Sequence, residues 1–201
     1  MKRLSTPAIV VFRRWLKIGC VPIVATGLWA DCLPAAAAEQ PVSSPTVASC
    51  VVPDCDAVAF VVAAIDAAQS EIRGQSYDFT SKRIAAALIR AKQRGVDVAM
   101  LFDKSTPCER NQAVDMLARS RISIDMDVRP RVANNKVLVI DKARVIVGSF
   151  DFSTVAASNA DNTNLISEPA IAQYFRTYWD ERRAKSVAYD ADHKAWCARE
   201  G

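Results

Sequence analysis

The sequence predicts an α/β domain in which helices flank a mixed β-sheet. From residue 50 onward, short apolar runs rich in β-branched residues alternate with longer segments whose apolar residues recur at helical spacing. Such alternation is typical of layered domains that bury a sheet. The chain after residue 38 is long enough for one domain with a sizeable core, and it contains no visible internal repeat.

The first half of this domain is predicted as helix, strand, helix and strand. The helices are expected at residues 57–68 and 81–94, and the strands at residues 72–79 and 96–102. Asp54 or Asp56 can cap the first helix, because a carboxylate accepts hydrogen bonds from the free N–H groups of a first turn. Gly95 is expected to end the second helix.

The second half is predicted to contain helices at 107–119 and 169–186, and strands at 122–128, 136–140, 144–147 and 164–166. Pro107 suits the first turn of a helix, where its missing N–H costs nothing. Residues 122–128 alternate apolar and charged side chains, as a half-exposed strand does. The turn Asp141-Lys142-Ala143 joins the two strands around it.

Residues 1–38 have the features of a cleaved export signal. Five basic residues precede a mostly apolar run: Lys2, Arg3, Arg13, Arg14 and Lys17. This run, residues 18–30, is shorter than the ~20 apolar residues of a bilayer span, and Pro22, Gly27 and Asp31 interrupt it, which disfavours a transmembrane anchor. Residues 35–38 are four alanines that permit cleavage after Ala38. The arginine pair leaves a twin-arginine signal open beside general secretion.

Removal of this segment changes the charge balance. It holds five of the 26 basic residues and one of the 22 acidic residues, so 21 of each remain and the formal net charge becomes zero. A strongly basic nucleic-acid-binding protein is therefore not indicated, although a local basic patch is compatible with this balance. Residues 39–49, rich in Pro, Ser and Thr, are predicted as a linker, residues 50–187 as the domain and residues 188–201 as a C-terminal tail.

Four cysteines follow the signal: Cys50, Cys55, Cys108 and Cys197. An even number in an exported chain favours disulfides, and four cysteines allow three connectivities. Cys50 and Cys55 are close in sequence and flank a turn, so a local bridge between them is the first choice, which leaves Cys108 to pair with Cys197. A zinc site is the competing interpretation, but the usual Cys-x2-Cys spacing is missing.

A lysine-centred motif stands in the middle of the predicted sheet. It runs Asn134-Asn135-Lys136-Val137-Leu138-Val139-Ile140-Asp141, and Gly148-Ser149-Phe150-Asp151-Phe152 follows it. Together these segments resemble the signature of the phospholipase D superfamily, His-x-Lys-x4-Asp with a downstream Gly-Ser-x-Asn. Residues 75–81, 94–98 and 101–104 resemble further segments of the family's small, single-motif bacterial endonucleases, in the same order. The resemblance extends from about Cys50 to about Asp180 and implies a phospholipase D-like layered domain.

The resemblance also implies phosphodiester hydrolysis without a metal or other cofactor. In the family, one histidine attacks phosphorus and a second protonates the leaving alkoxide. Lysine, serine and asparagine side chains neutralise the non-bridging oxygens. Single-motif members form homodimers that share one site, so the expected partners are a second copy of this chain and a phosphodiester ligand in DNA, RNA or phospholipid.

Six residues occupy the positions of the family's site residues: Asn134, Lys136, Asp141, Ser149, Asp151 and Asp161. Lys136, Asp141 and Ser149 match the lysine, aspartate and serine of the signature. Asn134 stands in place of the nucleophilic histidine, and Asp151 in place of the phosphate-binding asparagine. Asp161 replaces the glutamate that orients the histidine.

These three departures point the same way. An asparagine amide is neither a useful nucleophile nor a titratable acid near neutral pH. Asp151 would set a carboxylate against a phosphate oxygen, which costs about 1 kcal/mol at ~4 Å even in a water-like dielectric. Asp161 is one methylene shorter than glutamate and has no imidazole to orient. The sequence therefore predicts a degenerate site, in which Asp151 and Asp161 can form a closed polar network with Lys136 or neighbouring groups.

Structural roles compete with chemical ones for several residues. Asp141 suits a turn after a strand, and Ser149 can bond to nearby backbone. His193, the only histidine, lies in the predicted tail, where in-line attack at about 3–3.5 Å from phosphorus is not expected. Arg129 and Arg131 precede the motif and can either meet a phosphate or remain solvated.

The closing helix carries both basic and aromatic residues. A stripe of this kind can form a nucleic-acid surface. More often it packs its aromatic rings on a sheet and leaves its arginines in water, and this second arrangement is the expected one.

The predicted function is an exported phospholipase D-like phosphodiesterase domain, periplasmic or secreted, whose hydrolysis is impaired or lost because Asn134 replaces the nucleophile. No integral membrane span is expected after signal cleavage. The alternative is a non-catalytic protein that binds phosphate, nucleic acid or lipid, or that assembles with a partner. A heterodimer with a histidine-bearing relative is a third hypothesis, handicapped because one histidine would need to do two jobs.

Overall fold

The computed structural model describes residues 44–106 and 112–189, which belong to one compact unit, Val42–Gly201. The predicted signal, Cys108, Cys197 and His193 lie outside the described residues. The strands are β1 (Thr46–Val51), β2 (Glu71–Ser76), β3 (Asp97–Asp103), β4 (Ser123–Asp127), β5 (Lys136–Ile140), β6 (Arg144–Gly148), β7 (Asn162–Ser167) and β8 (Val187–Ala188). The helices are α1 (Ala57–Asp66), α2 (Lys82–Gln93), α3 (Gln112–Arg119), α4 (Pro169–Arg183) and the short 3-10 helix η2 (Ala156–Ser158).

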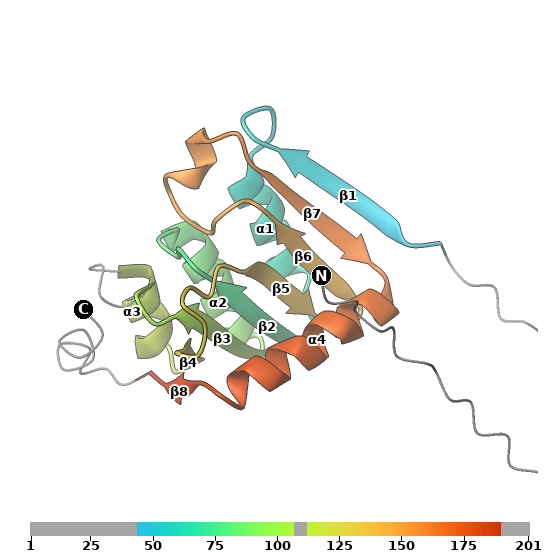
Figure 1. Cartoon of the computed structure of the whole chain (residues 1–201). Coiled ribbons are helices and arrows are strands. Elements are labelled where there is room, and N and C mark those ends of the chain that lie inside the picture. Colours follow the sequence, from blue (N-terminus) through green and yellow to red (C-terminus); the bar gives the residue numbers. More distant parts are fainter. Residues whose placement is uncertain (1–43, 107–111, 190–201) are drawn as a thin grey trace, which may run out of the picture. The chain divides into compact units, whose positions relative to one another are not determined.

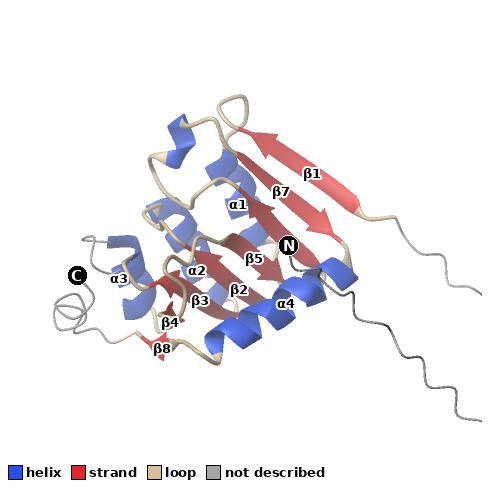
Figure 2. Cartoon of the chain, in the orientation of Figure 1, coloured by secondary structure: helices blue, strands red, loops and turns tan. Residues whose placement is uncertain are grey.

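These strands form one mixed sheet in the order β1-β7-β6-β5-β2-β3-β4-β8 (Figure 1). Strands β2, β3 and β4 run parallel to one another, and the other neighbouring pairs are antiparallel. Figure 2 shows α4 across one face of the sheet and α1, α2 and α3 on the other. The predicted α/β architecture with a mixed sheet and flanking helices is therefore confirmed.

The two faces of the sheet are packed differently. The main hydrophobic core lies between the sheet and α1, α2 and α3, and it includes Ile65, Leu88 and Leu117 from these helices. A smaller cluster beneath α4 joins Ala172 to valines of β5 and β6. The strands β5 and β6 thus bury side chains on both faces, which explains their continuous apolar runs.

Two predicted helix signals, the cap at Asp56 and the stop at Gly95, are confirmed, and Ser81 supplies a cap that was not predicted. The Asp56 carboxylate accepts a hydrogen bond from the backbone N–H of Ala59 at 2.8 Å and begins α1. The Ser81 hydroxyl accepts from the N–H of Ile84 at 3.4 Å at the start of α2. Gly95, just beyond α2, has a φ of +92°, a conformation that glycine adopts without a steric penalty.

Strands β1 and β8 were not predicted, and the bounds of β2 and β7 differ from those predicted by more than one residue. Strand β1 begins at Thr46, inside the segment expected to be a linker. It is an edge strand that buries only Cys50, so it lacks an apolar alternation, and its pairing with β7 provides the order. Strand β2 ends at Ser76 rather than Phe79, because the Ser76 hydroxyl donates to the Asp78 carbonyl at 2.8 Å where the chain turns.

A disulfide joins Cys50 at the end of β1 to Cys55 before α1, with 5.5 Å between their Cα atoms. This is the local bridge that was the first choice from sequence. It closes the turn that leads from the edge strand into the first helix.

The arginines of α4 are less solvated than expected. Three pairs tie this helix to the sheet: Arg176 with Glu71, Arg182 with Asp127, and Arg183 with Asp125. Trp179 is buried between them and donates a hydrogen bond from its indole nitrogen to the Gly74 carbonyl at 2.8 Å. Tyr174 and Tyr178 instead face solvent. The expected packing of aromatic rings on the sheet therefore holds for Trp179 and not for the tyrosines.

Candidate functional site

Strand pairing gathers five of the six motif residues, all except Asp141, at one end of the sheet. Lys136 begins β5 and lies beside Ser76, the last residue of β2. Gly148 ends β6 beside Thr163 of β7, so Ser149 and Asp151 follow at this end and Asp161 arrives at the same end just before β7. Antiparallel pairing of β5, β6 and β7 thus brings together positions that are up to 27 residues apart in the chain.

The Lys136 ammonium is enclosed and already has partners. Its side chain is 10% exposed, and Nζ lies 3.3 Å from Oδ1 of Asp151. Nζ also donates a hydrogen bond to Oδ1 of Asn134 and lies 5.7 Å from the centre of the Tyr77 ring. The ion pair between Asp151 and Lys136, one of the arrangements expected from the sequence, is therefore present. The positive charge that would meet a phosphate oxygen is directed at groups of the protein itself.

The Asp151 carboxyl is partly buried. Burial raises the pKa of Asp151 above its usual value, and the nearby Lys136 ammonium only partly opposes this effect. The backbone N–H of Asp78 donates to Oδ1 of Asp151 at 3.4 Å, while the negative charge of the Asp78 side chain raises the pKa further. Asp151 is therefore a carboxyl group whose ionisation costs more than that of a solvated aspartate.

Ser149 is likewise occupied. Its hydroxyl donates to Oδ1 of Asp161 at 2.7 Å and accepts from the backbone N–H of Asn162 at 3.1 Å. A serine hydroxyl has one proton to donate. Because that proton is used by Asp161, Ser149 offers no free donor to an incoming oxyanion in this arrangement.

Asp141 does not join the other five residues. It lies after β5, at the opposite end of that strand from Lys136. Its carboxylate accepts hydrogen bonds from the backbone N–H groups of Ser70 at 2.7 Å and Gln69 at 3.0 Å, and it pairs with Arg144 at 3.0 Å. Burial opposes ionisation here, but these N–H donors outweigh it and lower the pKa of Asp141. Asp141 therefore ties the β5–β6 turn to the start of β2.

The loop that presents Asn134 is held by a residue that the sequence reasoning did not assign to the site. Asp103, at the end of β3, is 2% exposed and accepts from the backbone N–H of Ala133 at 2.6 Å and from that of Ser105 at 2.9 Å. An aspartate directly after an apolar central strand was the available signal. Tyr77 and Asp78 were also missed as neighbours of Lys136 and Asp151, because only the turn after β2 brings them there.

Arg129 and Arg131 are exposed on the loop that leads from β4 toward Asn134.

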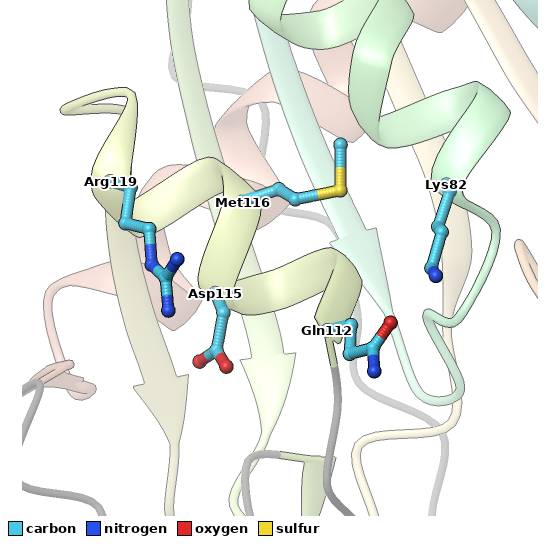
Figure 3. Close-up of a pocket in the computed structure, with 5 residues that line it drawn as sticks. All are labelled: Lys82, Gln112, Asp115, Met116 and Arg119. Carbon is cyan, nitrogen blue, oxygen red and sulfur yellow. The ribbon is translucent and has the colours of Figure 1, made fainter.

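A separate open cavity of about 480 Å³ lies between the start of α2 and α3. Figure 3 shows Lys82 of α2 facing residues of α3 across it, and none of the six motif residues lines this cavity. Within the described part of the chain, no group of three or more histidine, cysteine or acidic residues is arranged to hold a metal ion.

Comparison with known proteins identifies the family of this chain. A family model described as "Cardiolipin synthase, PLD-like domain" matches residues 61–183. A phospholipase D of Rickettsia conorii is 36% identical over 141 residues, which cover 70% of each chain. The chain therefore belongs to the phospholipase D superfamily.

One solved structure supports the same assignment, and a second one shares the fold. The phospholipase D family member Nuc from Salmonella typhimurium has a TM-score of 0.71 and 32% identity, over 74% of this chain and all of that one. NucT from Helicobacter pylori shares the fold with a TM-score of 0.65 at 19% identity, over 73% of this chain and all of that one.

No helix in the described ranges is long and apolar enough to cross a membrane.

Proposed function

We propose that this protein is an exported phospholipase D-like domain that has lost phosphodiester hydrolysis. Attack on phosphorus needs a nucleophile, and departure of the alkoxide needs an acid. At the position that the family motif reserves for histidine, Asn134 supplies neither, because its amide does not titrate near neutral pH. No histidine lies within the described residues.

The observation that carries this proposal is the pairing of both phosphate-facing donors with carboxylates. Lys136 is paired with Asp151, and Ser149 donates to Asp161. Both carboxylates stand at positions that depart from the family pattern. A phosphodiester would need to displace these contacts and would meet negative charge, with a repulsion of about 1 kcal/mol per charge at ~4 Å in a water-like dielectric and more in a dry site.

Export is supported by the disulfide between Cys50 and Cys55, since such bonds persist in oxidising compartments outside the cytosol. It is also supported by the signal-like composition of residues 1–38. A homodimer is part of the proposal, by analogy with single-motif members of the family, and two copies would contribute two Asn134 side chains to a shared site.

Phosphodiesterase turnover of the purified protein tests the proposal. The substrates are bis(p-nitrophenyl) phosphate and plasmid DNA, each with EDTA. The native protein is expected to stay at background, and Asn134→His to gain weak activity at most. Asp151→Asn removes the carboxylate from Lys136, and Asp161→Glu restores the residue that orients the histidine in the family, so Asn134→His combined with both is expected to gain more.

A matched variant separates true turnover from a contaminant. If the native protein hydrolyses either substrate and Lys136→Ala abolishes that rate, the proposed loss of activity is wrong and another nucleophile must be sought. A rate that Lys136→Ala leaves unchanged belongs to a contaminant, and the proposal stands.

A further inference from the structure

The contact between Lys136 and Asp151 determines whether this end of the sheet can accept an anion. Lys136 has two acceptors, Oδ1 of Asp151 at 3.3 Å and Oδ1 of Asn134. Only the first is charged. While Asp151 is ionised, the pair is close to neutral, and an oxyanion arriving at Lys136 meets a carboxylate on the same ammonium.

Protonation of Asp151 changes both halves of this pair. A carboxylic acid is uncharged and has one O–H donor beside a carbonyl acceptor. The Lys136 charge would then be unopposed by Asp151, and the new O–H could donate to an oxygen of the ligand. The same two side chains would therefore change from a closed ion pair into a cation and a neutral donor, which is the combination that binds a singly charged oxyanion.

The charged groups around Asp151 come from two other elements. The Lys136 ammonium faces it from β5 and favours the ionised carboxylate. From the turn after β2, the Asp78 backbone N–H also favours the carboxylate, while the Asp78 side-chain charge disfavours it. Asp161 lies on the Ser149 side of the site, and its carboxylate accepts the serine proton.

We propose that the site binds a phosphodiester or a comparable singly charged oxyanion when Asp151 is protonated, and releases it when Asp151 ionises. This inference rests on the proposed function in one respect, because the bound ester would be held and not cleaved. The Tyr77 ring lies 5.7 Å from Nζ of Lys136 and helps to enclose it. The ammonium therefore keeps one contact that does not depend on the charge of Asp151.

Burial moves this switch toward higher pH. It raises the pKa of Asp151, so the carboxyl takes up its proton at a higher pH than a solvated aspartate does. Above that pKa the competent, protonated fraction falls tenfold per pH unit, and the apparent affinity should fall by about tenfold per pH unit with it.

Dimethyl phosphate is a suitable probe, because it keeps a single negative charge from pH 4.5 to 7.5. Its binding to the purified protein is followed by NMR titration of the backbone amides near Gly148 and Ser149, at fixed ionic strength. Near-ultraviolet circular dichroism at each pH checks that the fold persists. The native protein is expected to bind more tightly at pH 4.5 than at pH 7.5, with the slope stated above.

Three variants assign the effect. Asp151→Asn should bind at both pH values with nearly equal affinity, because its amide is always neutral. Lys136→Met should lose binding throughout. Asp161→Asn should keep the native pH dependence.

Several outcomes would overturn the switch. The first is equal affinity of the native protein at both pH values. The second is a pH dependence that Asp151→Asn retains or that Asp161→Asn abolishes. The third is the absence of binding both by the native protein at pH 4.5 and by Asp151→Asn. The two proposals fail separately, since hydrolysis by the native protein contradicts the loss of activity, and these binding results contradict only the switch.

Discussion

Asp141 and Asp151 show how neighbours decide what burial does to a carboxyl group. Both are partly buried, and burial alone would raise the pKa of each. Around Asp141, backbone N–H groups of Ser70 and Gln69 outweigh burial and lower the pKa. Around Asp151, Lys136 and a single long N–H contact do not outweigh it, and the pKa is raised. The first residue is therefore built to stay ionised and the second is not.

Asp141→Asn should destabilise the fold by about 2 kcal/mol at pH 7, the scale of a lost charge-assisted hydrogen bond. Asparagine keeps the shape and tolerates the positive φ of +56° at this position, so the change isolates the charge. Because the folded pKa of Asp141 lies below the ordinary value of 3.8, its contribution is complete above that pH and is lost as pH falls through the folded pKa. Urea denaturation at pH 7, 5 and 3 should show the difference between variant and native shrinking at pH 3.

Asp54→Asn is the matched control, because Asp54 is an exposed carboxylate on the turn before α1. It should change the free energy of unfolding by less than about 0.5 kcal/mol. An equal loss in both variants, or an Asp141→Asn effect that does not change with pH, would contradict the anchoring role of Asp141.

Among the elements, the approach of β6 to β7 shapes the site. Gly148 leaves no room for a side chain, since a Cβ there would lie 2.2 Å from the Asn162 carbonyl oxygen and 2.8 Å from the Thr163 Cα. This close approach sets Ser149 beside Asp161 and Asn162. The polar contacts of the site therefore depend on a glycine that has no side chain to take part in them.

Gly148→Ala should cost more than about 3 kcal/mol, beyond the usual 1–3 kcal/mol of overpacking, because the clash is with backbone. Gly74→Ala is the comparison. There the added Cβ would meet the flexible end of Met100 at 2.3 Å and a methyl group of Leu138 at 2.9 Å, and side chains can shift. Urea denaturation of both variants measures the difference, and a larger cost for Gly74→Ala would contradict this account.

At the scale of the whole molecule, the proposed export bears on the stability of the edge strand β1. Strand β1 is held to the domain by its pairing with β7 and by the disulfide from Cys50 to Cys55. The bridge closes a short loop and should contribute about 2 kcal/mol by restricting the unfolded chain. Export into an oxidising compartment would preserve this disulfide, which restrains the first strand of the domain.

Expression in a bacterial host tests export directly. Intact-mass measurement of the protein outside the cytosol is expected to give a chain that begins at Glu39. Alkylation without reduction should leave Cys50 and Cys55 unmodified, and alkylation after reduction should modify both. A full-length chain confined to the cytosol would contradict the proposed export.

Much of the fold could be predicted because local signals and packing agree. The cap at Asp56, the stop at Gly95 and the apolar runs of β3 and β5 act over a few residues. The reach of β1 into the expected linker could not be predicted, because an edge strand with one buried residue shows no alternation. The ion pairs beneath α4 were hidden for a similar reason, since Glu71 of β2 meets Arg176 only across 105 residues of chain.

Residue types and spacing alone specify the family, the order of the main elements from α1 to α4, and the asparagine and two aspartates that depart from the motif. Which groups those side chains contact depends on the tertiary structure. Antiparallel pairing of β5, β6 and β7 places the Asp151 carboxylate on Lys136 and the Asp161 carboxylate on Ser149, and it carries Asp141 to the far end of the sheet. The physical reason is that charge and hydrogen bonding act over a few ångströms, and folding alone sets which groups lie within that range.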